Sequence, residues 1–247
     1  MMIKKIQTIV PMLAMAIFVF AGFVMAAEPN LVGRWNLNDN TSNTAKDSSG
    51  NKLDGAVSGI NVVDGKFGNA YDFSSNGFVK IANNTLAEPN NVSIEAWVKS
   101  SSSPGQFKYI FAKGANGDAY ASYALYTGSS GGLSFYVADN NGFYLSPDAG
   151  VGIWDGGWHH ITGTYDGSFI RLYVDSAEIG SGTPHNTAIT YNLPDSNDLF
   201  IGSYNGMTSH GFTGTIDEVR LWNRALTAAE IAKHATSNSS AVAPYMD

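Results

Sequence analysis

Acidic residues on predicted strands are the first side chains of this sequence that could do chemistry. A glycoside hydrolase needs two carboxyl groups, which lie about 5–5.5 Å apart in a retaining enzyme, and same-face positions on one strand can provide that spacing. Glu95 is alone in its predicted strand, and the neighbours Asp217 and Glu218 point to opposite faces of theirs. Asp139 and Asp148 fall in predicted loops. The pattern favours a protein that is not an enzyme, with a hydrolase built from distant acids left open as an alternative.

The adjacent residues His159 and His160 are the second candidate for chemistry. A Ser or Cys nucleophile would need such a base, but the sequence contains no cysteine. Because neighbours on a strand face opposite sides, the two imidazoles do not form a pair. We expect them to pack and hydrogen-bond within the fold, and a zinc site has less support.

Aromatic side chains in the turn-rich part of the chain could bind carbohydrate. Aromatic faces stack on the C–H surfaces of sugars, while amides and carboxylates bond to the hydroxyls. Such rings gather between residues 118 and 154 and again in the glycine-rich segment 203–211. The predicted ligand-binding residues are Tyr120, Tyr123, Phe143, Tyr144, Trp154 and Tyr204. The alternative is that each ring belongs to the strand core or its rim.

Short strands must position these residues. Val92, Ile94, Ala96 and Val98 alternate with polar or large residues, which is the pattern of a strand with one buried face. Many such runs are separated by Gly, Asn and Asp, which indicates an all-β, two-sheet antiparallel sandwich or jelly roll. The runs 70–73 and 78–81 flank Ser-Ser-Asn-Gly and are expected to form a hairpin.

A short helix is expected near the C-terminus. Thr227 and Glu230 are spaced as a capping box before the run from Ile231 to Ala235. The segment 237–247 is rich in Ser, Asn and Ala and is expected to be a flexible tail. No repeat or interdomain linker is visible, so residues 28–236 are interpreted as one domain.

Composition and the first residues indicate an exported protein. Lys4 and Lys5 precede an uncharged run from Ile9 to Ala27 that ends in small residues, the pattern of a signal peptide over residues 1–27. An uncleaved membrane anchor is the alternative. The formal net charge is −7 and no basic stripe exists, which disfavours nucleic-acid binding. We expect a secreted, periplasmic or cell-surface protein with no membrane contact after signal cleavage.

Four segments resemble the laminin-G-like jelly-roll domains of the concanavalin A-like lectin/glucanase superfamily. They stand in the family's order over 31–234, and Ser176 replaces a glycine that the family usually has. The segments are Asp47–Asn51, Ser93–Val98, Gly157–Asp175 and Gly214–Thr227. The resemblance implies the jelly-roll fold, but it does not fix function, because lectins, adhesins and hydrolases share this fold.

The resemblance also implies a structural calcium where the beginning of the chain meets its end. Calcium takes about six to eight oxygen ligands from carboxylates and carbonyls. Asp47 and Asp217 are the leading candidates, and Asn38 and Asn51 are additional ones. The alternative is that Asp47 and Asn51 only cap a turn, and that Asp217 pairs with Arg220 or Arg224.

These expectations combine into a leading hypothesis, a non-catalytic, lectin-like module that binds carbohydrate and contains a structural calcium. The first alternative is an adhesion domain that binds an extracellular protein. The second is a glycan-active hydrolase or lyase.

Overall fold

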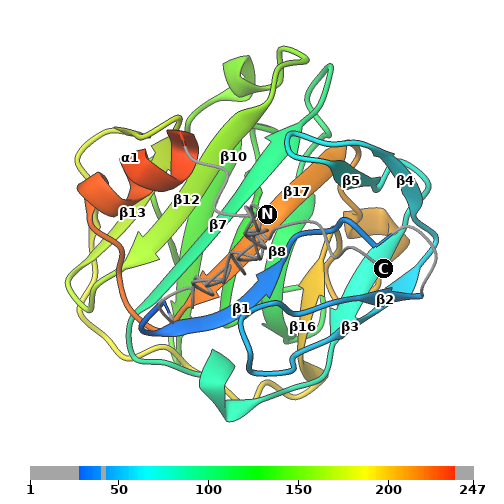
Figure 1. The fold of residues 1–247 in the computed structure, drawn as a ribbon. Coiled ribbons are helices and arrows are strands. Elements are labelled where there is room, and N and C mark those ends of the chain that lie inside the picture. Colours follow the sequence, from blue (N-terminus) through cyan, green and yellow to red (C-terminus); the bar gives the residue numbers. More distant parts are fainter. Residues whose placement is uncertain (1–27, 40–42, 237–247) are drawn as a thin grey trace, which may run out of the picture.

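The computed structural model describes residues 28–39 and 43–236, which form two antiparallel sheets packed face to face (Figure 1). The predicted signal peptide and C-terminal tail lie outside the described residues. The two sheets confirm the predicted all-β, antiparallel jelly-roll sandwich. None of the described helices is long and apolar enough to cross a membrane.

The nine-stranded sheet has β7 and β17 at its centre. In spatial order its strands are β14 (Ala177–Glu178), β13 (Phe169–Val174), β12 (His159–Tyr165), β7 (Val92–Lys99), β17 (Thr215–Trp222), β5 (Asn69–Asp72) and β4 (Asn61–Asp64). In addition, β1 (Leu31–Trp35) pairs with the second half of β17, and β15 (Thr183–Pro184) pairs with β13.

The eight-stranded sheet forms the other layer. In spatial order its strands are β11 (Gly142–Leu145), β10 (Leu133–Asp139), β9 (Tyr123–Thr127), β8 (Tyr109–Ala115), β16 (Ser196–Ile201), β6 (Phe78–Ile81), β3 (Gly55–Ser58) and β2 (Thr44–Ala45). Three 3-10 turns, η1 (Thr85–Ala87), η2 (Val151–Ile153) and η3 (Thr208–His210), lie in the connections.

The core fills the space between the two sheets. In β7 the predicted alternation is confirmed, because Val92, Ile94, Ala96 and Val98 all join this core. The sheets approach closely at Gly163 of β12, where a Cβ atom would lie 2.3 Å from the ring of Phe135. Glycine is therefore required at this position.

The predicted hairpin of 70–73 and 78–81 is wrong. β5 pairs with β17 in the nine-stranded sheet, whereas β6 pairs with β16 in the eight-stranded sheet. The turn between them carries the chain from one layer to the other, and Phe73 at its start is buried in the core. A turn sequence alone does not say whether the strands that it joins pair with each other.

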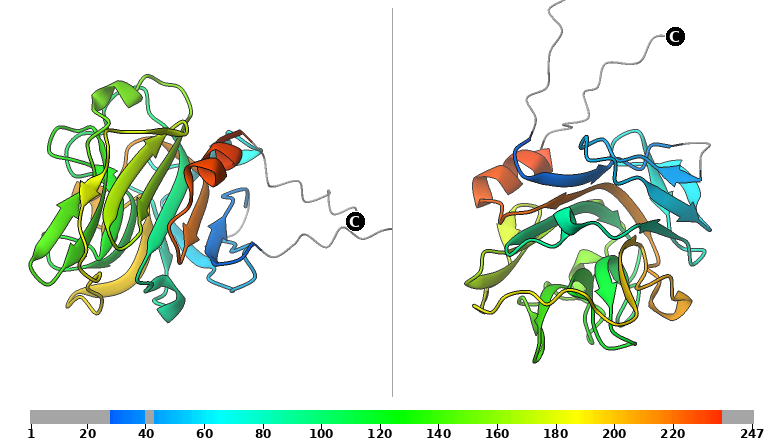
Figure 2. Two further views of the ribbon diagram at one scale, coloured as in Figure 1. Left: turned by 90° about the vertical axis from the view of Figure 1, so that its left-hand side faces the viewer. Right: turned by 90° about the horizontal axis from the view of Figure 1, so that it is seen from below.

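The C-terminal helix α1 (Ala228–Thr236) begins with the predicted capping box. The Thr227 amide donates to Glu230 Oε2 at 2.8 Å, and the Glu230 amide donates to Thr227 Oγ1 at 3.3 Å. Ile231 packs on Trp222 and Tyr173. Figure 2 shows α1 on the outer side of the nine-stranded sheet, away from the other layer.

Candidate functional site

A cluster of tyrosines lies on the outer face of the eight-stranded sheet. Tyr109 of β8, Tyr126 of β9 and Tyr136 of β10 belong to a hydrophobic cluster that is separate from the core between the sheets. Tyr109 is the register partner of Tyr126. The alanines beside them, Ala112 and Ala124, are small, so the rings can lie over the backbone of the sheet.

The rings of this cluster contact one another at defined angles. The centroids of Tyr126 and Tyr136 are 5.0 Å apart, with an interplanar angle of 83°. Those of Tyr109 and Tyr126 are 5.3 Å apart at 41°. The Tyr136 hydroxyl accepts a hydrogen bond from the Ala121 amide at 2.8 Å, which fixes this ring. The rings of the cluster therefore pack against one another on the outer face of the sheet.

These tyrosines line a pocket of about 230 Å³. The other lining residues come from surrounding loops and from β11: Phe107, Asp118, Ala119, Phe143 and His210. Phe107 and Phe143 at the rim are 43% and 42% exposed. The pocket thus has an aromatic floor and an accessible aromatic rim.

The pocket contains one carboxylate and no lysine or arginine among its described lining residues. That carboxylate belongs to Asp118, which is exposed. Burial raises the pKa of the hydroxyls of Tyr109, Tyr126 and Tyr136, so these phenols stay neutral at physiological pH. The site can offer aromatic surface, hydroxyls and one acid.

Part of the predicted ligand-binding set lies at this pocket. Phe143 lines it, and the partly buried Tyr120 packs beside it with a ring centroid 6.3 Å from that of Phe143. Tyr204 is buried, with its ring centroid 4.7 Å from that of Tyr109, and its hydroxyl donates to the Tyr120 carbonyl. Tyr204 supports the floor of the pocket but does not line it.

The other predicted ligand-binding residues lie elsewhere. Tyr123 is fully buried between the sheets and Trp154 is 5% exposed, so the prediction that they form a surface platform is wrong. Trp154 Nε1 donates inward to the Gly131 carbonyl at 2.9 Å. Tyr144, half-buried, stacks on His185 with centroids 4.2 Å apart.

Sequence reasoning missed Tyr109, Tyr126 and Tyr136. The available signal was alternation along the strands, because Leu125 and Phe135 face the core and their neighbours Tyr126 and Tyr136 must face outward. Bulky rings on the outer face of adjacent strands indicate a second aromatic surface.

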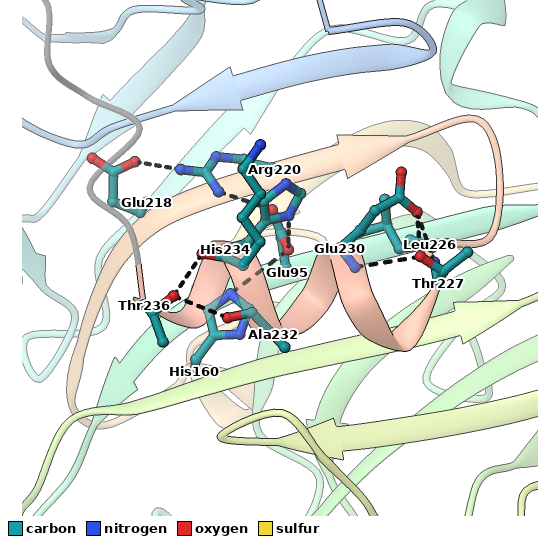
Figure 3. Close-up of polar contacts among 12 residues, drawn as sticks. Glu95, His160, Glu218, Arg220, Leu226, Thr227, Glu230, Ala232, His234 and Thr236 are labelled. Atoms are coloured by element: carbon teal, nitrogen blue, oxygen red, sulfur yellow. Dashed lines mark hydrogen bonds and ion pairs between the residues drawn. The ribbon is translucent and has the colours of Figure 1, made fainter.

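Glu95 and Glu218, the strand carboxylates considered for catalysis, belong to a buried network beneath α1 (Figure 3). Glu95 Oε1 accepts from Arg220 Nη1 at 2.9 Å, and Glu95 Oε2 lies 3.0 Å from His234 Nδ1 of α1. Arg220 Nη2 also donates to Glu218 Oε2 at 3.2 Å. Glu95 has no exposed surface, so these carboxylates cannot reach a polysaccharide in this arrangement.

The charges of the network are set by its own members. Burial raises the pKa of Glu95, but the hydrogen bond from His234 and the charge of Arg220 outweigh it and lower this pKa to about 2. Burial lowers the pKa of His160 to about 4 despite the nearby charge of Glu95. Glu95 is therefore ionised and His160 neutral at physiological pH. The network holds α1 on the sheet.

His159 has different surroundings from His160. Its Nδ1 lies 2.7 Å from Asp175 Oδ2, and its Nε2 lies 3.2 Å from Asp155 Oδ1. Burial alone would lower the pKa of His159, but these two carboxylates outweigh it and raise the pKa. The two histidines hydrogen-bond or pack within the fold, and neither lines the pocket.

The predicted metal ligands Asp47 and Asn51 organise a loop against β1. The carboxylate of Asp47 accepts from the amides of Arg34, Ser49 and Leu53 at 2.8–2.9 Å. Asn51 Nδ2 donates to the carbonyl of Val32 at 2.9 Å. These bonds match the turn-capping alternative.

Asn38 and Asp217 approach a different loop, residues 65–69. Asn38 Oδ1 accepts from the Asn69 amide at 2.6 Å, and Asp217 Oδ2 accepts from the Phe67 amide at 3.0 Å. Asp217 is fully buried, and burial raises its pKa to about 7. The described residues hold no cluster of three or more acidic or histidine side chains suited to a metal. The structural calcium therefore stays a prediction, with Asp47 and Asn51 capping a turn and with Asn38 and Asp217 bonded to the loop 65–69.

Comparison with known proteins identifies a family and several structural neighbours. A family model described as the concanavalin A-like lectin/glucanases superfamily matches residues 73–232. The search of curated proteins gives no match. Domain 4 of an extracellular arabinanase from Geobacillus stearothermophilus, solved with arabinotriose, is 22% identical with a TM-score of 0.64. The match covers 83% of this chain and 98% of that domain.

In two further neighbours the match covers only part of the other chain. A structure of botulinum neurotoxin type C, from a study of its dependence on two ganglioside molecules, is 14% identical with a TM-score of 0.59. The match covers 83% of this chain and 50% of that one. A Trypanosoma rangeli sialidase mutant is 20% identical with a TM-score of 0.60, and the match covers 82% and 32%. At these identities the neighbours share the fold with this chain.

Proposed function

Because this chain belongs to the concanavalin A-like lectin/glucanases superfamily, we propose that it is a non-catalytic carbohydrate-binding module that works outside the cytoplasm. The aromatic pocket on the outer face of β8, β9 and β10 is the observation on which this proposal rests. Rings at the rim, with hydroxyls and a carboxylate beside them, are the groups that bind the apolar and polar surfaces of a sugar.

The distribution of acids supports a binding role rather than hydrolysis. Glycoside hydrolysis uses two carboxyl groups on either side of the scissile bond. Asp118 is the one acid that lines the described pocket, and Glu95 and Glu218 are buried under α1. A module of this kind holds a glycan without cleaving it.

The arabinanase domain provides a first ligand to test, since its structure contains arabinotriose. We expect Phe143→Ala and Phe107→Ala each to weaken glycan binding about tenfold or more, as for a central aromatic contact. Isothermal titration calorimetry with arabinotriose, after a glycan-array screen, measures the affinities. Leu86→Ala removes an equally exposed apolar side chain from η1 that is not part of the pocket lining, and it should leave binding unchanged.

The proposal fails if no glycan on the array binds, or if both rim variants bind as tightly as the wild type. Thermal melting of each variant separates a loss of contact from a loss of folding. Because both phenylalanines are more than one-third exposed, we expect their melting temperatures to stay close to that of the wild type.

A protein partner is the second candidate function, and β11 is the feature that favours it. β11 is the edge strand of the eight-stranded sheet, and Phe143 and Leu145 on it are exposed. A partner strand could add to such an edge. Self-association or capture of a defined partner that is lost in Leu145→Lys, with glycan binding absent, would favour adhesion.

A further inference from the structure

The walls of the aromatic pocket meet at steep angles. The Tyr136 ring stands at 83° to Tyr126 and at 85° to Tyr109. Phe143 lies 5.2 Å from Tyr136 at an interplanar angle of 50°. Because the three tyrosines are at most 5% exposed, they pack on one another as a floor, and the exposed rings of Phe107 and Phe143 are the ones that a ligand would contact first. The volume of about 230 Å³ also suits a small group.

The described lining of the pocket contains one carboxylate, Asp118, and no lysine or arginine. Within the described part of the chain, the Asp118 carboxylate makes no hydrogen bond or ion pair. Lys108 directly precedes Tyr109 in the sequence. Its Nζ donates to the Ser209 carbonyl at 2.6 Å, and it is not among the residues that line the pocket. The whole chain has a formal net charge of −7. An anionic ligand would therefore be repelled, and a cation would be attracted.

We propose that this pocket binds an ammonium group, and that the glycans it selects are those that bear one, such as amino sugars with free amines. The faces of aromatic rings attract a cation through their quadrupole, and Asp118 at the rim adds a full negative charge. The exposed rings of Phe107 and Phe143 would contact the group from the rim, and the nearly buried tyrosines would form the floor beneath it. The extension to amino sugars rests on the proposed function, whereas binding of the ammonium group itself does not.

The neutral state of the tyrosines supports this inference. Ionised phenols are not needed, because the quadrupole belongs to the neutral ring. Burial raises the pKa of all three tyrosine hydroxyls, so the pocket keeps the same character across the physiological range. Asp118 is then the residue whose charge can be altered without disturbing the aromatic floor, since it is exposed.

Choline and its uncharged carbon isostere, 3,3-dimethylbutan-1-ol, test the charge preference at constant shape. We expect the full chain to bind choline about tenfold or more tighter than the isostere, because desolvated cation–π contacts are worth this much. Asp118→Asn should weaken choline binding severalfold and leave the isostere unchanged. Asp64→Asn, which removes an exposed charge from β4 of the other sheet, should change neither. Titration calorimetry and ligand-observed NMR measure these affinities.

A second arm compares glucosamine oligomers with their N-acetylated forms at about pH 6, where the free amines are protonated. Tighter binding of the free amines, lost in Phe143→Ala, supports the inference. Equal affinity for choline and its isostere, or no effect of Asp118→Asn, overturns it. If choline binds but no oligosaccharide does, the ammonium site stands and the proposed glycan function falls. If only uncharged sugars bind, the proposed glycan function stands and the ammonium site falls.

Discussion

His159 and His160 are neighbours in the sequence, yet their surroundings shift their pKa values in opposite directions. Burial lowers the pKa of His160 to about 4, whereas the carboxylates of Asp175 and Asp155 raise that of His159. The strand geometry is the reason, because β12 turns one ring under α1 and the other toward two loops. Two neighbours on a strand can therefore have pKa values that shift in opposite directions.

The pH dependence of stability should reveal this difference. An unfolded His160 takes up a proton below about pH 6.5, whereas the folded one stays neutral until about pH 4. The unfolded state thus binds more protons in this range, and stability is lost as the pH falls from 6.5 to 4, by on the order of 3 kcal/mol. We expect His160→Gln to flatten this part of the profile, measured by urea denaturation at a series of pH values.

His159→Gln provides a control of opposite sign. A raised folded pKa contributes stability that is present below about pH 6.5 and lost as the pH rises through the folded value. This variant should therefore lose stability mainly on the acid side, and by less, because the ring is partly exposed. Identical slopes for the wild type and both variants would contradict these assignments.

At the scale of single elements, the turn between β13 and β14 contains a removable strain. Asp175 and Ser176 form this two-residue turn, with φ values of 48° and 73°. A non-glycine residue in the left-handed region destabilises the folded state by roughly 1–2 kcal/mol. Replacing it with glycine removes this strain, but the greater freedom of glycine in the unfolded chain offsets about 0.4–1 kcal/mol of the gain. We expect Ser176→Gly to raise the free energy of unfolding by about 0.5–1 kcal/mol.

Chemical denaturation measures this gain, and Ser181→Gly is the matched control. Ser181 is an exposed loop residue that is not in the left-handed region. Glycine there only adds freedom to the unfolded chain, so this variant should be slightly less stable than the wild type. A loss of stability in Ser176→Gly would contradict the interpretation of the turn.

Strands and helices with a strong local sequence pattern could be predicted from the sequence. Which strands pair with each other could not. The alternation of β7 and the capping box of α1 follow from local rules. The pairing of β5 and β6 depends on which layer each strand joins, and Ser-Ser-Asn-Gly does not encode this. Bulges or irregularities also change register, for example between Tyr109 and Phe111 and between Asp217 and Arg220, and no local pattern marks them.

In the candidate site, the sequence likewise predicts some residues correctly and misplaces others. The loop-rich segment around Phe143 predicts a ligand contact for this ring, and Phe143 lines the pocket. Tyr123 is close to this segment in the sequence, but its side chain shares the inward face with Leu125. Tyr126 faces the opposite way and lines the pocket. Assigning each aromatic residue to a face before grouping would have separated the core from the site.

At the scale of the whole molecule, the two sheets use their outer faces differently. The nine-stranded sheet buries charged residues beneath α1, which Figure 3 shows over Glu95 and Arg220. The eight-stranded sheet instead forms the pocket. This division places the groups that hold the chain together on one side and the groups available to a ligand on the other.

The junction between the first strands and β17 is where a calcium ion would stabilise the whole molecule. Asn38 follows β1 and Asp217 lies in β17, and both bond the loop 65–69, so an ion there would join three distant segments. A ligand that binds only the folded state raises its stability. We expect excess chelator to lower the melting temperature of the wild type, and Asp217→Asn to remove this difference.

Asp47→Ala should destabilise the loop equally with and without chelator, because its carboxylate bonds backbone amides. A melt that is unchanged by chelator, with no calcium found by elemental analysis, would rule out the ion and leave Asp217 as a buried acid held by amides alone.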